Sequence, residues 1–345
     1  MRTQSMRPNL IVLSFAVLAI ACGCGPRSRP GEGSTKGKLA RPPAPPPSYP
    51  AQRKVPLDPR LAEAAERELT DALNSTDPII RVHALEALPQ IKGPAHNEQI
   101  LHALNDPEAV VRFAAALAAG QLKLAAAHEP LLKLAEDRSE NVRVAVRYAL
   151  HRLGDTRLSH ELEKLANDSS PRVRGNTAMV LGMLGNPSAL RILHLLRIDP
   201  NPAVREQASE AMWRLGDDEG LKDLVGLTCS KFYDDQMIGY LGIALPRDDK
   251  VRQHVRGGLV LEGKNDPLEP PLVAARAMGM LGSDEGYGIA QIGAASDDPR
   301  RRSLAALAFG AIGRADAQEI LRKLLADPAP GVRVAAATAI LQLKA

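Results

Sequence analysis

The stretch Asp168-Ser-Ser-Pro-Arg-Val-Arg-Gly-Asn-Thr-Ala-Met-Val-Leu-Gly-Met-Leu-Gly185 is one copy of a unit that repeats along most of the chain. Its second arginine recurs with a spacing of 31 residues in two runs. These arginines are Arg81, Arg112, Arg143, Arg174 and Arg205 in the first run, and Arg302 and Arg333 in the second. Self-similarity at a fixed period of this length predicts a stacked repeat architecture.

Each unit contains signals for an inner helix with a defined start and end. Residues that cap helix N-termini stand four positions before the arginine, at Asp77, Ser139, Ser170, Asn201 and Asp298. Alanine recurs six positions after the arginine, and leucine or isoleucine ten positions after it, on one helical face. Glycine, which accepts positive φ, then ends the helix at Gly154, Gly185, Gly216, Gly282 and Gly313. A second, outer helix is expected to follow, for example over 158–167 and 187–198.

An acidic residue also repeats in phase with the arginine. Aspartates stand six positions before it, at Asp106, Asp137, Asp168, Asp199 and Asp327. We expect them to form a ladder between successive repeats with Arg112, Arg143, Arg174, Arg205 and Arg333, which would fix the stacking angle. Solvated charges on a loop are the alternative.

The combined pattern of aspartate, arginine, alanine and leucine-glycine resembles HEAT-like repeats, in the short form found in phycobilin-lyase-type HEAT proteins. The resemblance covers residues 57–345 and implies an all-α fold: a right-handed α-solenoid of about nine helix pairs, roughly 80–90 Å long if the helix axes lie about 8–10 Å apart. Two units between Arg205 and Arg302 are irregular, with extra residues expected within 248–271. The irregular region, 217–282, is either a binding insertion or drift.

The N-terminus has the pattern of an export signal. Arg2 and Arg7 precede an apolar run over residues 10–21, which is too short to span a bilayer and is typical of a signal peptide. The segment Leu18-Ala-Ile-Ala-Cys22 resembles the lipobox of bacterial lipoproteins. This resemblance implies cleavage before Cys22, acylation of Cys22 and an anchor in the cell envelope, at the outer membrane or its periplasmic face. Plain secretion and an uncleaved short anchor stay open as alternatives.

Composition divides the rest of the chain into a tether and a repeat body. Residues 22–56 are rich in proline, glycine and basic side chains, and we expect a disordered tether there. The excess of positive charge lies in residues 1–56, which leaves residues 57–345 at a net −4, so a nucleic-acid surface is not expected. Cys229 lies in an apolar run and is expected to be buried.

The repeat region shows no catalytic or metal-binding motif. Deoxyhypusine hydroxylases, which are related to these repeats, hold two irons through several His-Glu dipeptides. Only two such dipeptides occur here, His128-Glu129 and His160-Glu161, and we interpret them as surface residues. No cofactor, no metal and no small-molecule substrate is therefore predicted. A lyase- or hydroxylase-like enzyme or cofactor carrier is kept as the alternative.

The remaining candidate is the inner face of the solenoid. Large side chains stand at positions expected to face solvent there: Phe113, Arg147, Tyr148, His151, Glu210 and Trp213. Trp213, the only tryptophan, stands where other units have Gly120 and Gly182. Aromatic residues and arginine are favoured at binding hot spots, so we interpret this set as a protein-binding patch. The alternative is that the rings fill gaps between inner helices. The sequence thus predicts an envelope-anchored, non-catalytic scaffold that binds a protein partner.

Overall fold

The computed structural model describes residues 56–91, 96–261 and 267–343, and these are built from helices joined by short turns. The predicted all-α solenoid is confirmed, and the described helices form nine outer–inner pairs. The outer helices are α2 (Pro59–Leu73), α4 (Asn97–Ala103), α6 (His128–Lys133), α8 (Glu161–Leu165), α10 (Leu190–Leu196), α12 (Asp218–Thr228), α14 (Arg252–Gly257), α16 (Tyr287–Ala294) and α18 (Gln318–Leu325). The inner helices are α3 (Pro78–Ala87), α5 (Ala109–Gln121), α7 (Glu140–Arg152), α9 (Pro171–Leu184), α11 (Pro202–Arg214), α13 (Tyr233–Ala244), α15 (Glu269–Met280), α17 (Pro299–Ile312) and α19 (Pro330–Leu343).

The predicted helix-capping residues all stand at N-cap positions, and three of the five cap through their side chains. The carboxylates of Asp77 and Asp298 and the amide of Asn201 each accept a hydrogen bond from the backbone N–H two residues later. At Ser139 and Ser170, which also occupy N-cap positions, the side chains make no capping bond. There the preceding aspartates, Asp137 and Asp168, accept from the backbone N–H of the serines instead.

Small residues set the distance between neighbouring inner helices. The repeated alanines are almost completely buried: Ala87, Ala118, Ala149, Ala211, Ala277, Ala308 and Ala339. In several units, glycine stands two positions after the place of this alanine and lets the next inner helix come closer still. A Cβ added at Gly182 would lie 2.7 Å from the Cα of Ala211, and one at Gly120 would lie 2.8 Å from the Cα of Ala149. These contacts leave no room for a larger side chain.

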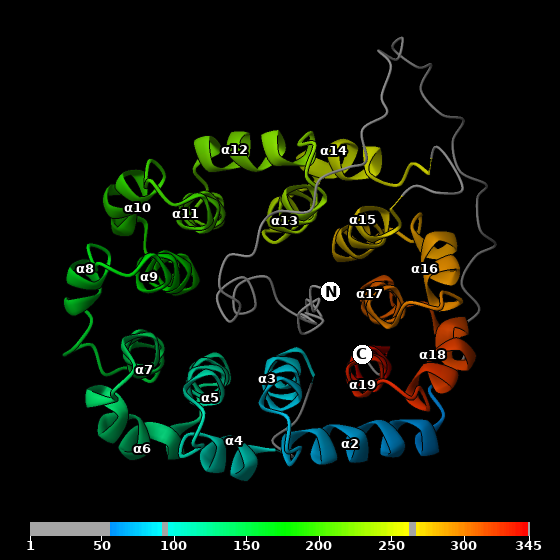
Figure 1. Ribbon diagram of the computed structural model, residues 1–345, viewed down its shortest axis with the longest axis horizontal. Coiled ribbons are helices and arrows are strands. Elements are labelled where there is room, and N and C mark those ends of the chain that lie inside the picture. The colour runs from blue at the N-terminus through cyan, green and yellow to red at the C-terminus, as the bar shows by residue number, and fades with distance from the viewer. Residues whose placement is uncertain (1–55, 92–95, 262–266, 344–345) are drawn as a thin grey trace, which may run out of the picture.

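The nine pairs do not form an extended stack, because the first and last pairs pack against each other. Figure 1 shows the inner helices as a ring around an opening, with α2 beside α18 and α19. The apolar face of α2, which includes Leu61, Ala65 and Leu69, is buried. The first and last pairs would otherwise expose one apolar face each, and closure of the ring covers both.

Polar contacts also join the two ends of the ring. The guanidinium of Arg333 on α19 donates to the carboxylate of Glu68 on α2 over 2.9 Å. Arg322 on α18 donates to the carboxylate of Asp58 over 2.9 Å. The side chain of Gln318 accepts from the backbone N–H of Asp58. These residues are about 260 positions apart in the sequence, so their contacts define a closed ring.

The residue that follows each inner helix adopts a left-handed conformation in seven units. Five of these residues are glycine, with φ between 73° and 94°, as predicted: Gly154, Gly185, Gly216, Gly282 and Gly313. The other two are Lys123 (φ 51°) and Arg247 (φ 59°). A side chain in this conformation is unfavourable by about 1 kcal/mol or more. Lys123 and Arg247 therefore occupy positions at which the backbone conformation favours glycine.

We predict that Lys123→Gly raises the free energy of unfolding by about 1 kcal/mol, because glycine adopts this φ without strain. Gly185→Ala is the matched reverse change. A Cβ at Gly185 meets no atom within 4 Å, so only the backbone conformation opposes the substitution, and stability should fall. Urea unfolding of both variants measures the effect. If Lys123→Gly left the unfolding midpoint unchanged or lowered it, the strain at this position would be refuted.

Candidate functional site

The expected inner-face patch is not exposed, and this prediction is corrected. Five of its six side chains lie in the core: Phe113, Arg147, Tyr148, Glu210 and Trp213. The sixth, His151, is partly buried and contacts the hydroxyl of Ser159 at 2.8 Å. These side chains fill contacts with neighbouring inner helices, as Trp213 does, or with outer helices, as Arg147 does. The alternative from the sequence, that these side chains fill gaps, agrees with their burial.

The contacts of two buried side chains show how these gaps are filled. The Trp213 indole N–H on α11 donates to the backbone oxygen of Ile243 on α13 over 3.0 Å, so the tryptophan bridges two inner helices. Glycine at the same position of other units lets the neighbouring helix come within direct backbone contact. Arg147 donates to the Glu161 carboxylate of α8 and thereby links an inner helix to an outer one.

The repeated arginines and aspartates meet between successive units at four places. In each pair the guanidinium donates through two nitrogens to both oxygens of the aspartate 25 residues later. The pairs are Arg81–Asp106, Arg112–Asp137, Arg174–Asp199 and Arg302–Asp327. The third guanidinium nitrogen donates to backbone oxygens at the start of its own unit, as Arg174 does to Asp168. Each arginine therefore ties one inter-unit turn to the next.

The other arginines of the series have different partners. Arg143 donates to Glu140 and to the backbone of Asp137, and among the described residues no hydrogen bond joins it to Asp168. Arg205 donates to the backbone oxygens of Asp199 and Pro200, because its unit is followed by an irregular one. Arg333 belongs to the last unit and pairs with Glu68 of the first.

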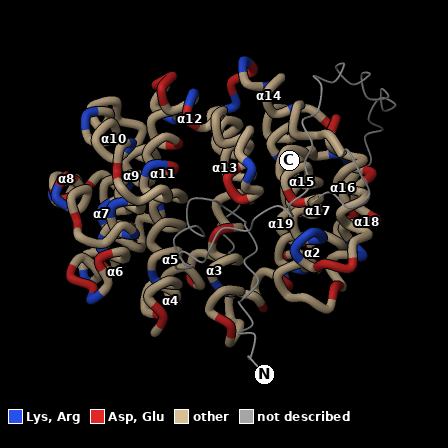
Figure 2. The backbone as a smooth tube through the Cα atoms, turned by 45° about the horizontal axis from the view of Figure 1, so that its top comes forward, with Lys and Arg blue, Asp and Glu red and all other residues tan. Residues whose placement is uncertain are grey.

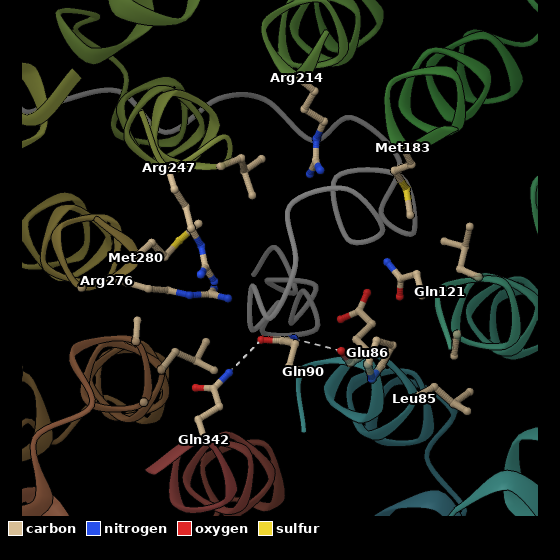
Figure 3. Close-up of a pocket in the computed structure, with 18 of the residues that line it drawn as sticks. Leu85, Glu86, Gln90, Gln121, Met183, Arg214, Arg247, Arg276, Met280 and Gln342 are labelled. Carbon is tan, nitrogen blue, oxygen red and sulfur yellow. Dashed lines mark hydrogen bonds between the residues drawn. The ribbon is translucent and has the colours of Figure 1, made fainter. Parts of the chain in front are cut away.

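A cavity of about 780 Å³ occupies the centre of the ring (Figure 3). We call it the central cavity. Seven inner helices and the C-terminal end of α13 contribute to it, mostly through their last turns. Its polar lining consists of Glu86, Gln90, Gln121, Arg214, Arg247, Arg276 and Gln342, and its larger apolar side chains are Leu85, Leu117, Met183, Leu245, Met280 and Leu307. The volume lies within the range typical of ligand pockets.

Three guanidinium groups point into the central cavity from different elements (Figure 3). Arg214 comes from α11 and Arg276 from α15, while Arg247 follows α13. Burial lowers the pKa of Arg276 to about 10, and the carboxylate of Glu86 opposes this shift, so Arg276 is still charged at neutral pH. Burial also raises the pKa of the Glu86 carboxyl, against the charge of Arg276. The lining is therefore mainly cationic at neutral pH.

The sequence contained a signal for this lining that the inner-face prediction missed. Residues nine positions after the repeated arginine line the cavity in several units, as Gln90, Gln121, Met183, Arg214 and Gln342 do. Glu86 stands five positions after Arg81, and Leu307 five after Arg302. The inner-face prediction included the fifth position but not the ninth. Which side of an inner helix faces the opening depends on the curvature of the array, and a single unit does not specify that curvature.

The remaining predicted residues lie on the outside of the ring or outside the described ranges. His128 is partly exposed and Glu129 exposed, and His160 is exposed while Glu161 pairs with Arg147. Cys229 is exposed, which corrects the prediction of a buried thiol; it is the residue that follows the last turn of the outer helix α12. The predicted signal peptide (1–21), Cys22 and all of the tether (22–56) except Pro56 lie outside the described residues.

The part of the chain that the structure describes holds neither a cluster of metal-binding side chains nor a membrane-spanning helix. No group of three or more histidine, cysteine, aspartate or glutamate side chains is placed to hold a metal ion in that part of the chain. None of its helices is both long enough and apolar enough to cross a membrane. Figure 2 shows basic and acidic residues interspersed along the helices of the ring.

Comparison with known families identifies the repeats. Residues 66–151, 128–213 and 158–235 match the family model of HEAT repeats. Together with the helix pairs of the structure, these matches show that the chain is a HEAT-like repeat protein. No curated protein matches the sequence significantly.

Among solved structures, the chain is similar to one from the CpcE–CpcF complex of phycocyanin lyase from Nostoc sp. PCC7120. That match has 19% identity and a TM-score of 0.43, and it covers 71% of this chain and 97% of the other. Human deoxyhypusine hydroxylase in complex with glycerol matches with 20% identity and a TM-score of 0.36, over 83% and 99% of the two chains.

We predict that Arg174→Ala lowers the free energy of unfolding by about 2 kcal/mol at pH 7, because it leaves the buried Asp199 carboxylate without its charged partner. Arg143→Ala is the matched control. Arg143 makes no hydrogen bond to the aspartate of the next described unit. Its replacement should therefore lower the free energy of unfolding by less than Arg174→Ala does.

The effect of Arg174→Ala should depend on pH. The hydrogen bonds from Arg174 lower the pKa of Asp199, while burial opposes them. A carboxyl whose folded pKa lies below its unfolded value, about 3.9, stabilises the fold above that value. This contribution is lost as pH falls toward the folded pKa. Urea unfolding from pH 7 to pH 3 should therefore show the free energies of unfolding of the parent and of Arg174→Ala converging below about pH 4. A difference between these free energies that stays constant with pH would contradict the ion-pair explanation.

Proposed function

We propose that this protein is a non-catalytic scaffold that holds a segment of a protein partner in its central cavity. The observation that carries the proposal is the cavity itself, which is lined by side chains from seven inner helices and the end of α13. A binding site built on rigid packed helices pays little ordering entropy when it binds. The lining combines guanidinium and amide groups with methionine and leucine, a mixture that suits a polypeptide segment.

We further propose that the ring is held at the bacterial cell envelope by a lipid on Cys22, at the outer membrane or its periplasmic face. The lipobox-like segment before Cys22 and the proline-rich stretch that follows support this proposal. Such a stretch gives a semi-rigid spacer of about 3.1 Å per residue, which would place the ring away from the membrane surface. No observation on the described residues favours the lyase- or hydroxylase-like alternative.

One experiment in cells tests both parts. A photo-crosslinking amino acid replaces Gln121, which is exposed at the cavity, or Lys164, which is exposed on the outer helix α8. We expect the Gln121 position to give a discrete crosslinked protein in the membrane fraction, and the Lys164 position to give none. With Cys22→Ala added, the same crosslinked product should leave the membrane fraction, because the lipid attachment site is absent.

The contradicting outcomes differ for the two parts. A Cys22→Ala chain that remained with the membranes would refute the lipid anchor. Equal crosslinking from Gln121 and Lys164, or from neither, would refute the cavity as the binding site. Stoichiometric iron or a visible chromophore in the purified protein would favour the enzyme or cofactor-carrier alternative.

A further inference from the structure

Arg247 has the left-handed backbone conformation of the equivalent residues in six other units, but it carries a long charged side chain where five of them have glycine. Five units place glycine at this position, and the chain keeps an arginine here in the left-handed region at φ 59°. Its side chain is exposed and points into the central cavity (Figure 3). No hydrogen bond links its guanidinium to another described residue, so packing within the ring does not account for it. Strained residues that the surrounding fold does not need are often found at functional sites.

Two further arginines face the same space. The guanidinium of Arg214 is held from one side by the carboxylate of Glu210, with Nε at 3.1 Å, and its terminal nitrogens point toward the opening. Arg276 enters the cavity from α15. The C-terminal ends of the inner helices meet here, and their negative dipole ends stabilise nearby cations. The ring can therefore hold several positive charges together before any ligand binds.

Three primary amides complete the polar lining. Gln342 donates to the side-chain oxygen of Gln90 over 3.1 Å, where the last inner helix meets the first unit. Gln121 lies farther around the ring (Figure 3). A primary amide offers both a donor and an acceptor, which are the two groups that a peptide backbone presents.

We propose that the central cavity recognises an acidic peptide segment, with carboxylates bound by Arg214, Arg247 and Arg276 and the peptide backbone contacted by the glutamine amides. This inference rests on the proposed function and adds the chemistry of the partner. Guanidinium groups bind carboxylates through paired, charge-assisted hydrogen bonds. The single acidic side chain of the lining, Glu86, opposes such a ligand.

Nucleic acid fits the cavity less well than an acidic peptide. The residues that line it include no aromatic ring on which a base could stack. The repeat body, residues 57–345, also carries net negative charge, which disfavours a long polyanion approaching over its surface. A short acidic peptide would lie within the cavity, where it would contact the arginine side chains rather than the acidic outer surface.

The test is the binding of a fluorescein-labelled octaglutamate peptide to the full-length protein, measured by fluorescence polarisation. A labelled octaserine peptide serves as the uncharged control. Unlabelled inorganic pyrophosphate is added as a competitor, and its affinity is obtained from the displacement of labelled octaglutamate. We expect octaglutamate to bind and octaserine not to bind. Arg247→Gly should weaken octaglutamate binding by about tenfold, because it removes one charge-assisted contact.

The controls separate recognition from folding. Arg247→Gly relieves backbone strain, so the variant should be at least as stable as the parent while it binds less tightly. Lys123→Gly makes the same change at the same position of another unit, outside the cavity lining, and should leave binding unchanged. Unfolding curves of both variants show that any loss of binding is not a loss of structure.

Three outcomes would overturn the inference: equal binding of octaglutamate and octaserine, octaglutamate affinity unchanged by Arg247→Gly, or pyrophosphate bound more tightly than octaglutamate. The last outcome would define a small-anion site instead. If octaglutamate binds as expected and the Gln121 position gives no crosslinked protein in cells, the proposed function fails and the anion site stands. If crosslinking succeeds and Arg247→Gly has no effect on octaglutamate, the acidic-peptide inference alone fails.

Discussion

Burial of each helix pair against its neighbours is the constraint on which the structure depends. A pair of short helices cannot cover its apolar face alone, so every unit is stable only beside another. In an open array the two terminal units leave one face each uncovered. Here α2 packs against α19, and each of the nine pairs has a neighbour on both sides. Ring closure therefore gives the two terminal units the same packing on both sides that the interior units have.

The repeat pattern predicts most of this architecture. Capping residues at the helix starts, the buried alanine row and the glycines with positive φ all appear where the spacing of 31 residues places them. These features act within one unit or between adjacent units, so a single sequence is sufficient to find them. The arginine–aspartate pairs also follow the spacing, and Arg143 departs from it although its own unit is regular. The sequence offers no reason for that exception.

Closure and the lining of the cavity could not be predicted in the same way. Both depend on the small rotation between successive units, summed over nine of them, and this rotation follows from packing details such as Trp213 standing where glycine stands elsewhere. An error of a few degrees per unit changes a ring into an open superhelix and turns different side chains toward the centre. The expected patch therefore fell on residues that pack between helices, and it did not include Gln121 or Arg247. A non-glycine residue at a glycine position was the available clue to Arg247.

A double-mutant cycle between Glu68 and Arg333 tests the closed ring most directly. The two side chains belong to the first and last helices, and their charged groups lie 2.9 Å apart only if the ring is closed. The account predicts that Glu68→Arg and Arg333→Glu each lower the free energy of unfolding, and that the double variant recovers stability, with a coupling energy of about 1 kcal/mol or more. Strictly additive effects of the two substitutions would show that the ends do not meet and would contradict the ring.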